Sequence, residues 1–348
     1  AAAAGAAVGQ AERELEVIAQ VTPEQVGEIR AFLERCPIQV GLAATTQIFY
    51  IEVLAFGGDG SNSEVAISGF HTNVIRKRRN GQLLLQREEA AERESPCDEK
   101  SLLSIEGALE FADTVELDDV RALVQRQIDY NYAIAQEGLR GNYGANIGSV
   151  LLKHDGDDVK VRAKAYAAAG SDARMNGCEL PVVIVSGSGN QGITSSVPVV
   201  VYAKELGVSE EKMLRAVVLS DLITIHQKSG IGRLSAYCGA ISAGCGAGAG
   251  IAYLYGGGYE EIAHTVVNAL AVVSGVVCDG AKASCAAKIA AAVDAGILGY
   301  WMYREGNQFF GGDGIVSKGV ENTIRNVGRL AREGMKETDK EIIKIMLE

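Results

Sequence analysis

The C-terminal half of this chain is rich in alanine and glycine, and this feature constrains its fold more than any other. The 348 residues include 42 glycines and long alanine runs, whereas aromatic residues make up only 6% of the chain. Small residues let helices approach closely, so this composition favours tightly packed helices. The length is sufficient for two domains and for a large hydrophobic core.

The first hundred residues have a different pattern, which predicts an α+β domain. Thr22-Pro23-Glu24-Gln25 is a capping box with proline at the first helical position, so we expect a helix over 23–35. Asn80-Gly81 is a signal for a tight hairpin turn, and Gly57–Gly60 supplies another turn. The β-like runs around these turns predict an antiparallel meander. They are Gln47–Phe56, Glu64–Phe70, Thr72–Arg79 and Gln82–Arg87.

Helix signals dominate from Ser101 onward. The charged segment Arg87–Lys100, which contains Pro96, is the predicted linker, so we expect domains at 1–100 and 101–348. The expected fold class is α+β, with a small N-terminal α/β part followed by a large all-helical domain. Helices are expected near 116–138, 158–170, 193–206, 209–227, 232–255, 259–275, 281–297 and 318–346.

Charge and hydropathy exclude several classes of partner. A net charge of −11 argues against nucleic acid, because phosphates need a basic surface. The basic cluster Arg76–Arg79 precedes Asn80-Gly81 and is interpreted as a solvated hairpin tip. The apolar stretches 234–258 and 265–278 contain Gly, Ser, Asn and Cys, so we interpret them as buried helices and expect no membrane association.

The chain is expected to reside in the cytoplasm. Its first residues, AAAAGAAVGQ, lack the basic region and apolar core of a signal peptide. Seven cysteines, an odd number without a paired short-range pattern, fit a reducing compartment better than a disulfide framework.

Three of these cysteines predict a metal centre. Cys238, Cys278 and Cys285 are separated by 40 and then 7 residues, and each is followed by a small or polar residue. Three thiolates without an obvious fourth ligand are typical of a site that keeps one metal position open for chemistry. Cys245 is a rival ligand, although its Gly-Ala surroundings fit helix packing at least as well. Cys36, Cys97 and Cys178 are interpreted as small hydrophobic residues.

A glycine-rich segment, SGSGNQG at 186–192, predicts an anion site. It follows an apolar run and precedes an expected helix, whose N-terminal amides would favour a small carboxylate. The alternative is a helix start that needs glycine only for packing. The candidate substrate-binding residues are Gly187, Ser188, Gly189, Asn190, Gln191 and the cation Arg233.

Two of the four histidines are candidate bases. His71 lies in GFHTNV, where several polar groups occur together, and His226 lies twelve residues before Cys238, close to Lys228 and Arg233. Catalytic and structural roles are equally compatible with both. His154 and His264 have no comparable neighbours in the sequence.

Together these motifs resemble those of a known family. SGSGNQG, IGRLSAYCGAISAG and VVCDGAKASCAAKI are similar to segments of the L-cysteine desulfidase family, which is related to the alpha chain of the iron–sulfur L-serine dehydratases. SDARMNGCELPVV, GNYGANIG and HTNV extend the likeness over nearly the whole chain. The resemblance implies a [4Fe–4S] cluster on Cys238, Cys278 and Cys285. It also implies β-elimination of L-cysteine to pyruvate, ammonia and sulfide, with L-serine dehydration as the sister reaction.

One departure from that family keeps alternatives open. Its members usually begin with a segment that holds a Gly-Cys-Thr-Glu-Pro motif, whose cysteine is thought to take part in catalysis, and residues 1–348 do not contain this motif. Either this sequence starts after that segment or the protein lacks it, and in the second case a catalytically impaired paralogue that binds a small amino acid is one alternative. The acidic surface and the Ala/Gly-rich helices are also compatible with a homodimer.

A lyase dependent on pyridoxal phosphate is the other alternative. In that interpretation Tyr255–Gly258 would bind the phosphate and Lys164 would form the Schiff base. Such a fold needs strands that alternate with helices in a parallel sheet, and residues 193–348 carry almost no strand signal.

Overall fold

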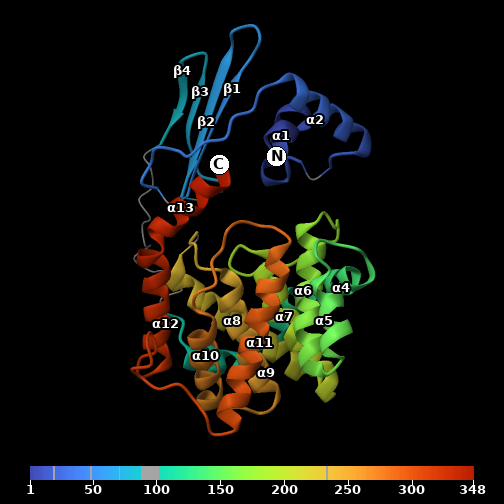
Figure 1. Cartoon of the computed structure of the whole chain (residues 1–348), viewed down its shortest axis with the longest axis vertical. Coiled ribbons are helices and arrows are strands. Elements are labelled where there is room, and N and C mark those ends of the chain that lie inside the picture. The colour runs from blue at the N-terminus through green and yellow to red at the C-terminus, as the bar shows by residue number, and fades with distance from the viewer. Residues whose placement is uncertain (19, 48, 70, 88–101, 233) are drawn as a thin grey trace. The chain divides into compact units, whose positions relative to one another are not determined.

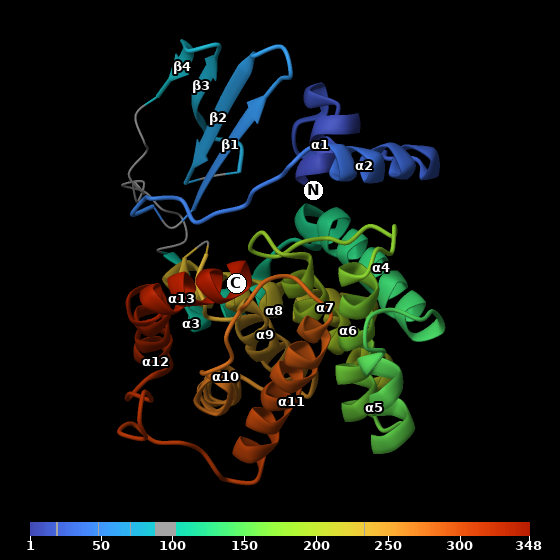
Figure 2. The same cartoon turned by 45° about the horizontal axis from the view of Figure 1, so that its top comes forward.

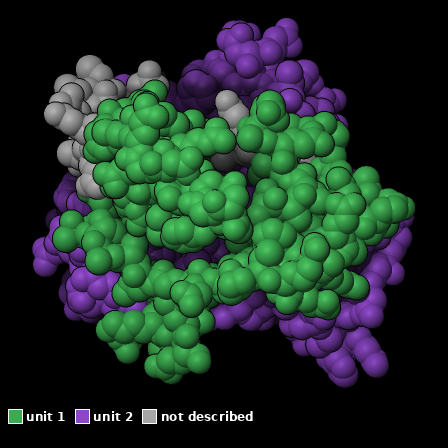
Figure 3. All heavy atoms as spheres, turned by 90° about the horizontal axis from the view of Figure 1, so that it is seen from above, with its two compact units in different colours: residues 1–94, 341–348 green, residues 95–340 purple. Residues whose placement is uncertain are grey.

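The computed structural model describes residues 1–18, 20–47, 49–69, 71–87, 102–232 and 234–348 (Figure 1). It divides into two compact units, residues 1–94 with 341–348 and residues 95–340, which Figure 3 colours separately. The sequence predicted a boundary at residue 100 and a linker over Arg87–Lys100, of which 88–100 lie outside the described residues. The last residues, 341–348, group with unit 1, contrary to the expected 101–348 domain.

Unit 1 confirms the predicted antiparallel meander. Its strands follow one another in chain order across a four-stranded sheet, and every neighbouring pair is antiparallel. Asn80 and Gly81 have positive φ angles of 50° and 79°, as the tight turn requires. The strands are β1 (Tyr50–Phe56), β2 (Asn62–Ser68), β3 (Val74–Arg79) and β4 (Gln82–Gln86). The helical elements are α1 (Ala2–Val8), the 3-10 turn Ala11–Glu16 and α2 (Pro23–Arg35).

The predicted helix cap in unit 1 is also confirmed, whereas the predicted solvated hairpin tip holds for residues 77–79 and not for the partly buried Arg76. Helix α2 begins after the Thr22 cap, whose hydroxyl accepts from the Gln25 amide while the Gln25 side chain accepts from the Thr22 amide. In the basic cluster, Arg76 lies within β3 and pairs across the sheet with Glu52 and Glu64. The cluster is therefore partly neutralised within the sheet.

Unit 2 is helical, as predicted (Figures 1 and 2). Its helices are α3 (Ile105–Thr114), α4 (Leu117–Arg140), α5 (Ile147–Asp155), α6 (Val159–Met175), α7 (Gly189–Leu206), α8 (Glu210–Ile231), α9 (Gly239–Leu254), α10 (Tyr259–Val273), α11 (Ser284–Arg304) and α12 (Val320–Arg329). A π-helical turn, Leu330–Gly334, joins α12 to α13 (Lys336–Leu347), so the single helix expected over 318–346 is interrupted.

Other differences from the sequence prediction have physical causes. Helices α3 and α5 were not predicted. The amide of Ile147, at the start of α5, donates to the Asp172 carboxylate at 2.7 Å, and this cap comes from α6 and not from a local sequence signal. Helix α9 begins at Gly239 and not at residue 232, because the segment around Tyr237 pairs in an extended form with Val277.

Helix α9 occupies the centre of unit 2 and contacts α7, α8, α10 and α11. A Cβ atom added at Gly248 would lie 2.6 Å from the backbone oxygen of Gly296, and one at Gly244 would lie 2.5 Å from the carbonyl carbon of Ala292. These distances are shorter than any normal contact, so only glycine allows the two helices to pack at this separation. The alanine- and glycine-rich composition therefore produces close helix packing, as predicted.

Helix α11 has the length and apolarity of a membrane span, and no other helix among the described residues passes that test. However, 56% of its apolar window is buried inside the structure. Burial of this kind is typical of the core helix of a packed domain.

The packing of α9 generates a stability prediction. We expect Gly248→Ala to lower the free energy of unfolding by about 1–3 kcal/mol, because the added methyl group would overlap the backbone of α11. Gly230→Ala in α8 is the matched control, since its Cβ would lie 3.6 Å from the nearest atom, an ordinary contact. Urea denaturation followed by circular dichroism measures both. Equal stabilities for the two variants would contradict the expected backbone overlap.

Candidate functional site

The N-termini of α7, α9 and α11 lie at the same end of unit 2. Gly244 opposes Ala292 and Gly248 opposes Gly296, so α9 and α11 run in the same direction with a constant offset of 48 positions. If the same offset holds at the starts of the two helices, Cys238 lies opposite residue 286. Cys285, in the first turn of α11, is the neighbour of that residue.

Helix α7 has the same direction as α9. A Cβ on Gly239 would lie 2.7 Å from Gln191 Nε2, and one on Gly250 would lie 2.9 Å from Val199. Residue numbers therefore increase in the same direction along α7 and α9. The N-terminal turn of α7, which carries the glycine-rich motif, therefore lies against the start of α9. Helix N-termini carry partial positive charge, and three of them at one place favour bound anions.

Backbone pairing brings Cys278 to Cys238. The Cys238 amide donates to the Val276 carbonyl at 3.1 Å, and the Cys278 amide donates to the Ala236 carbonyl at 2.6 Å. Helix α10 ends at Val273, so Cys278 lies in the extended segment that follows it and not at a helix end. The sequence-predicted cysteine at position 278 thus lies beside the N-cap of α9.

Electrostatics also link the three thiols. Burial raises the pKa of Cys238, which is only 8% exposed. The Ala240 amide opposes this rise, and negative charge on Cys278 adds to it, with a smaller contribution from Cys285. Cys278 is exposed and Cys285 is partly buried, and the Cys285 thiol lies 3.6 Å from the Gly280 carbonyl. Cys238 is therefore the buried member of the three, and Cys278 is open to solvent.

No three His, Cys, Asp or Glu side chains within the described ranges are arranged to hold a single metal ion. A cluster imposes a different requirement from a single ion, because each cysteine binds a different iron and the sulfurs can stand further apart.

The antiparallel helices α6 and α8 bring cations to the same end. A Cβ on Gly189 would overlap the Arg174 guanidinium, which places the last turn of α6 against the first turn of α7. Arg174 Nη1 donates to Asn190 Oδ1 at 3.3 Å. Burial lowers the pKa of Arg174, and a negative charge on Cys285 opposes that shift. Arg174 therefore lies between the glycine-rich motif and a cysteine of the site.

Two lysines complete the positive surroundings. Lys228, 9% exposed in the last turn of α8, has its pKa lowered by burial, and negative charges on Cys278 and Cys238 oppose this shift. Lys288 donates to the Val277 carbonyl at 2.8 Å and pairs with Asp279. Burial alone would lower the pKa of Lys288, but Asp279 outweighs it and the pKa is raised.

The residues of the glycine-rich motif form the turn before α7 or contact neighbouring helices. Gly187, with a φ of 79°, and Ser188 form the turn, and the Ser188 hydroxyl accepts from the Gln191 amide at 3.4 Å. Gly189 leaves the room that Arg174 occupies. Asn190 contacts Arg174, and Gln191 is 5% exposed with its Oε1 buried and without a hydrogen-bond partner. Asn190 thus directs its side chain to Arg174, and Gln191 directs its side chain to the start of α9.

One candidate from the sequence, His226, is not directed to this place. His226 Nε2 lies 2.7 Å from Glu321 Oε2. Positions two residues apart on a helix differ by about 200°, so His226 points away from the side that carries Lys228. His71 belongs to unit 1, where its ring contacts Phe49 at a centroid distance of 4.6 Å. Arg233 lies outside the described residues.

The rival cysteines have other surroundings. Cys245 is fully buried in α9, about 10 Å further along the helix axis than Cys238. Cys178 is partly buried and hydrogen-bonds to Tyr143, and this contact is the main reason why the pKa of Tyr143 rises to about 12. Cys97 lies outside the described residues, and Cys36 is partly exposed after α2.

The structure does not favour a pyridoxal phosphate site. Lys164 Nζ lies 3.2 Å from Asp155 and 3.4 Å from Asp294, so its ammonium is held in ion pairs. Within the described part of the chain, the named strands all belong to the antiparallel sheet of unit 1, and unit 2 has no parallel sheet.

Sequence reasoning missed Arg174 and Lys288. In the sequence, the segment SDARMNG carries only a family likeness. The position of Arg174 beside the glycine-rich motif depends on the contact between α6 and α7. Lys288 lies three residues after Cys285, so it shares a helix face with that cysteine, and this spacing was the available signal.

Known proteins similar to this chain support a single family assignment. A family model described as serine dehydratase alpha chain matches residues 12–344. A UPF0597 protein of Desulfitobacterium hafniense is 58% identical over 347 residues, which cover 100% of this chain and 80% of that protein. A UPF0597 protein of Lachnoclostridium phytofermentans is 52% identical, covering 100% and 83%. A UPF0597 protein of Bacteroides thetaiotaomicron is 38% identical, covering 99% and 81%.

The environments of the thiols predict an order of alkylation. In the metal-free protein at pH 8 we expect iodoacetamide to modify Cys278, which is exposed, before the buried Cys238, and not to modify Cys245 until the protein unfolds. Burial raises the pKa of Cys245, so it holds almost no thiolate at pH 8. Peptide mass spectrometry over time, with and without urea, measures the order. Equal rates for Cys245 and Cys278 in the folded protein would be the contrary result.

Proposed function

This chain belongs to the serine dehydratase alpha chain family, and we propose that it is an iron–sulfur-dependent amino-acid lyase. The reaction that we propose is β-elimination of L-cysteine to pyruvate, ammonia and sulfide, with dehydration of L-serine as the sister reaction. The observation that carries the proposal is the gathering of Cys238, Cys278 and Cys285 beside three helix N-termini. We further propose that the protein works in the reducing cytoplasm, which keeps these thiols free.

The chemistry of the residues present supports the proposal of a [4Fe–4S] cluster. Three free cysteines would supply its thiolate ligands. The helix N-termini and the cations Arg174, Lys228 and Lys288 would offset the negative charge of those thiolates. When bound, such a cluster with three protein ligands supplies a Lewis acid at its open position, which can activate the substrate's leaving group.

The chain's own residues would hold the substrate. Arg174 provides a planar guanidinium for the carboxylate, and the amides of the first turn of α7 lie beside it. The buried and unpartnered Oε1 of Gln191 is an acceptor for the substrate's ammonium group. Together these groups would orient the Cα–H bond, and orientation contributes strongly to the rate of such reactions.

The base that removes the Cα proton stays a prediction. His226 is already hydrogen-bonded to Glu321, so we assign it a structural role. His71 is exposed and lies in unit 1, and its proposed role as a base is untested.

Activity after cofactor assembly tests the function. We expect the full-length protein, reconstituted anaerobically with iron and sulfide, to release pyruvate from L-cysteine or L-serine. Cys285→Ala should lose acid-labile sulfide and at least about 100-fold of the activity, because one of three ligands is missing. Cys245→Ala, which removes a buried thiol outside the site, is the control and should keep both.

Two results would contradict this proposal. One is a reconstituted wild-type protein that binds the amino acid, seen as thermal stabilisation, without forming pyruvate. That result would favour the amino-acid-binding alternative. The other is equal activity and equal iron content in Cys285→Ala and Cys245→Ala.

The role of Arg174 can be tested separately. We expect Arg174→Lys to raise KM for the amino acid at least about tenfold, because lysine cannot make two parallel hydrogen bonds to a carboxylate. Arg140→Lys, which changes an exposed arginine at the end of α4, should leave KM unchanged. Steady-state kinetics of pyruvate release measure both. An unchanged KM in Arg174→Lys would assign substrate binding to another group.

A further inference from the structure

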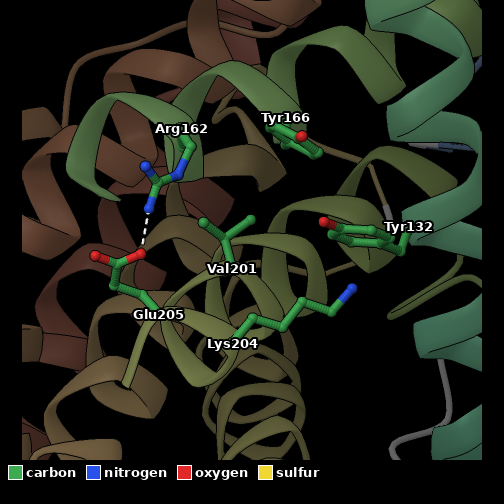
Figure 4. A pocket seen from close by; sticks show the side chains of 6 residues that line it. All are labelled: Tyr132, Arg162, Tyr166, Val201, Lys204 and Glu205. Atoms are coloured by element: carbon green, nitrogen blue, oxygen red, sulfur yellow. Dashed lines mark hydrogen bonds and ion pairs between the residues drawn. The ribbon is translucent and has the colours of Figure 1, made fainter. Parts of the chain in front are cut away.

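A polar cavity lies among α4, α6 and α7, toward the opposite end of α7 from the cysteines (Figure 4). Its volume is about 150 Å³, enough for a few non-hydrogen atoms. Lys204 in its wall follows Asn190 by fourteen positions on α7, about 21 Å along the helix axis. The lining residues are Tyr132, Arg162, Tyr166, Val201, Lys204 and Glu205.

The positive charge in this cavity is not balanced. Arg162 pairs with Glu205, and its Nη1 donates to the Asp157 carbonyl at 2.5 Å, so its charge is compensated. Lys204 has no carboxylate partner among the described residues, and its Nζ lies 3.5 Å from the centre of the Tyr132 ring. Burial lowers the pKa of Lys204, and Tyr166 opposes this shift only in part.

Two tyrosines supply the rest of the binding surface. The rings of Tyr132 and Tyr166 are stacked with centroids 5.6 Å apart. Figure 4 shows the Tyr132 hydroxyl directed toward the space above Val201 and the Lys204 ammonium beneath the Tyr132 ring, and all three residues line the cavity. Phenolic hydroxyls donate hydrogen bonds to oxyanions, and a lysine provides a point charge for them.

We propose that this cavity is a binding site for a small oxyanion, a carboxylate or a phosphate, held by Lys204 and the hydroxyls of Tyr132 and Tyr166. The site is independent of the lyase function, because none of these residues belongs to the cysteine site.

Isothermal titration calorimetry tests the proposal with two probes, sodium phosphate and sodium pyruvate, against sodium chloride at equal ionic strength. We expect at least one of the two oxyanions to bind the wild-type chain and chloride not to bind. Lys204→Met should weaken that binding at least about tenfold, the loss expected for a charge-assisted hydrogen bond, and Lys204→Arg should restore part of it. Tyr166→Phe should weaken it less.

Matched variants separate this site from the proposed catalytic one. Lys153→Met removes an exposed lysine of α5 and should bind as the wild type does. Arg174→Gln should also keep the binding, even if it abolishes turnover. Absence of binding for both probes would overturn the proposal, and so would equal affinity of the wild type and a folded Lys204→Met, which would leave Lys204 with only a helix-capping role at the C-terminus of α7.

Discussion

The contacts of α9 with its neighbours are the constraint on which the rest of unit 2 depends. Gly244 and Gly248 leave no space between α9 and α11, and Gly246 and Gly250 face Thr224 and Ala216 of α8 in the same way. These contacts fix the distance between helices and also their direction, since α11 runs parallel to α9 and α8 runs antiparallel. A helix with larger side chains on these faces could not occupy this central position.

The directions of the five helices around the site determine its electrostatics. The starts of α7, α9 and α11 carry partial positive charge, and they meet the ends of α6 and α8, where Arg174 and Lys228 are located. The partial charges of opposite helix ends would normally cancel one another. Here the two basic side chains offset the negative ends of their own helices, so the region as a whole remains favourable for thiolates and carboxylates.

The sequence predicted those parts of the structure that depend on local signals. The capping box of α2, the Asn80-Gly81 hairpin and the helical character of unit 2 were all recognised from short patterns. Helix α5 was missed because its cap comes from Asp172, 25 residues after Ile147. Arg174 was missed for a similar reason, because its contact with Asn190 exists only once α6 packs on α7. The extended segment at Tyr237, which shortens α9, likewise requires its partner at Val277.

The absence of side chains at Gly244 and Gly248 affects more than the packing of the two helices. These glycines determine the distance between the first turns of α9 and α11. Cys238 and Cys285 lie at those turns. The separation of Cys238 and Cys285 on these two helices is thus set by a rigid frame. A methyl group added at either glycine, several residues away, would push the two helices apart and widen the gap between these cysteines without altering either of them.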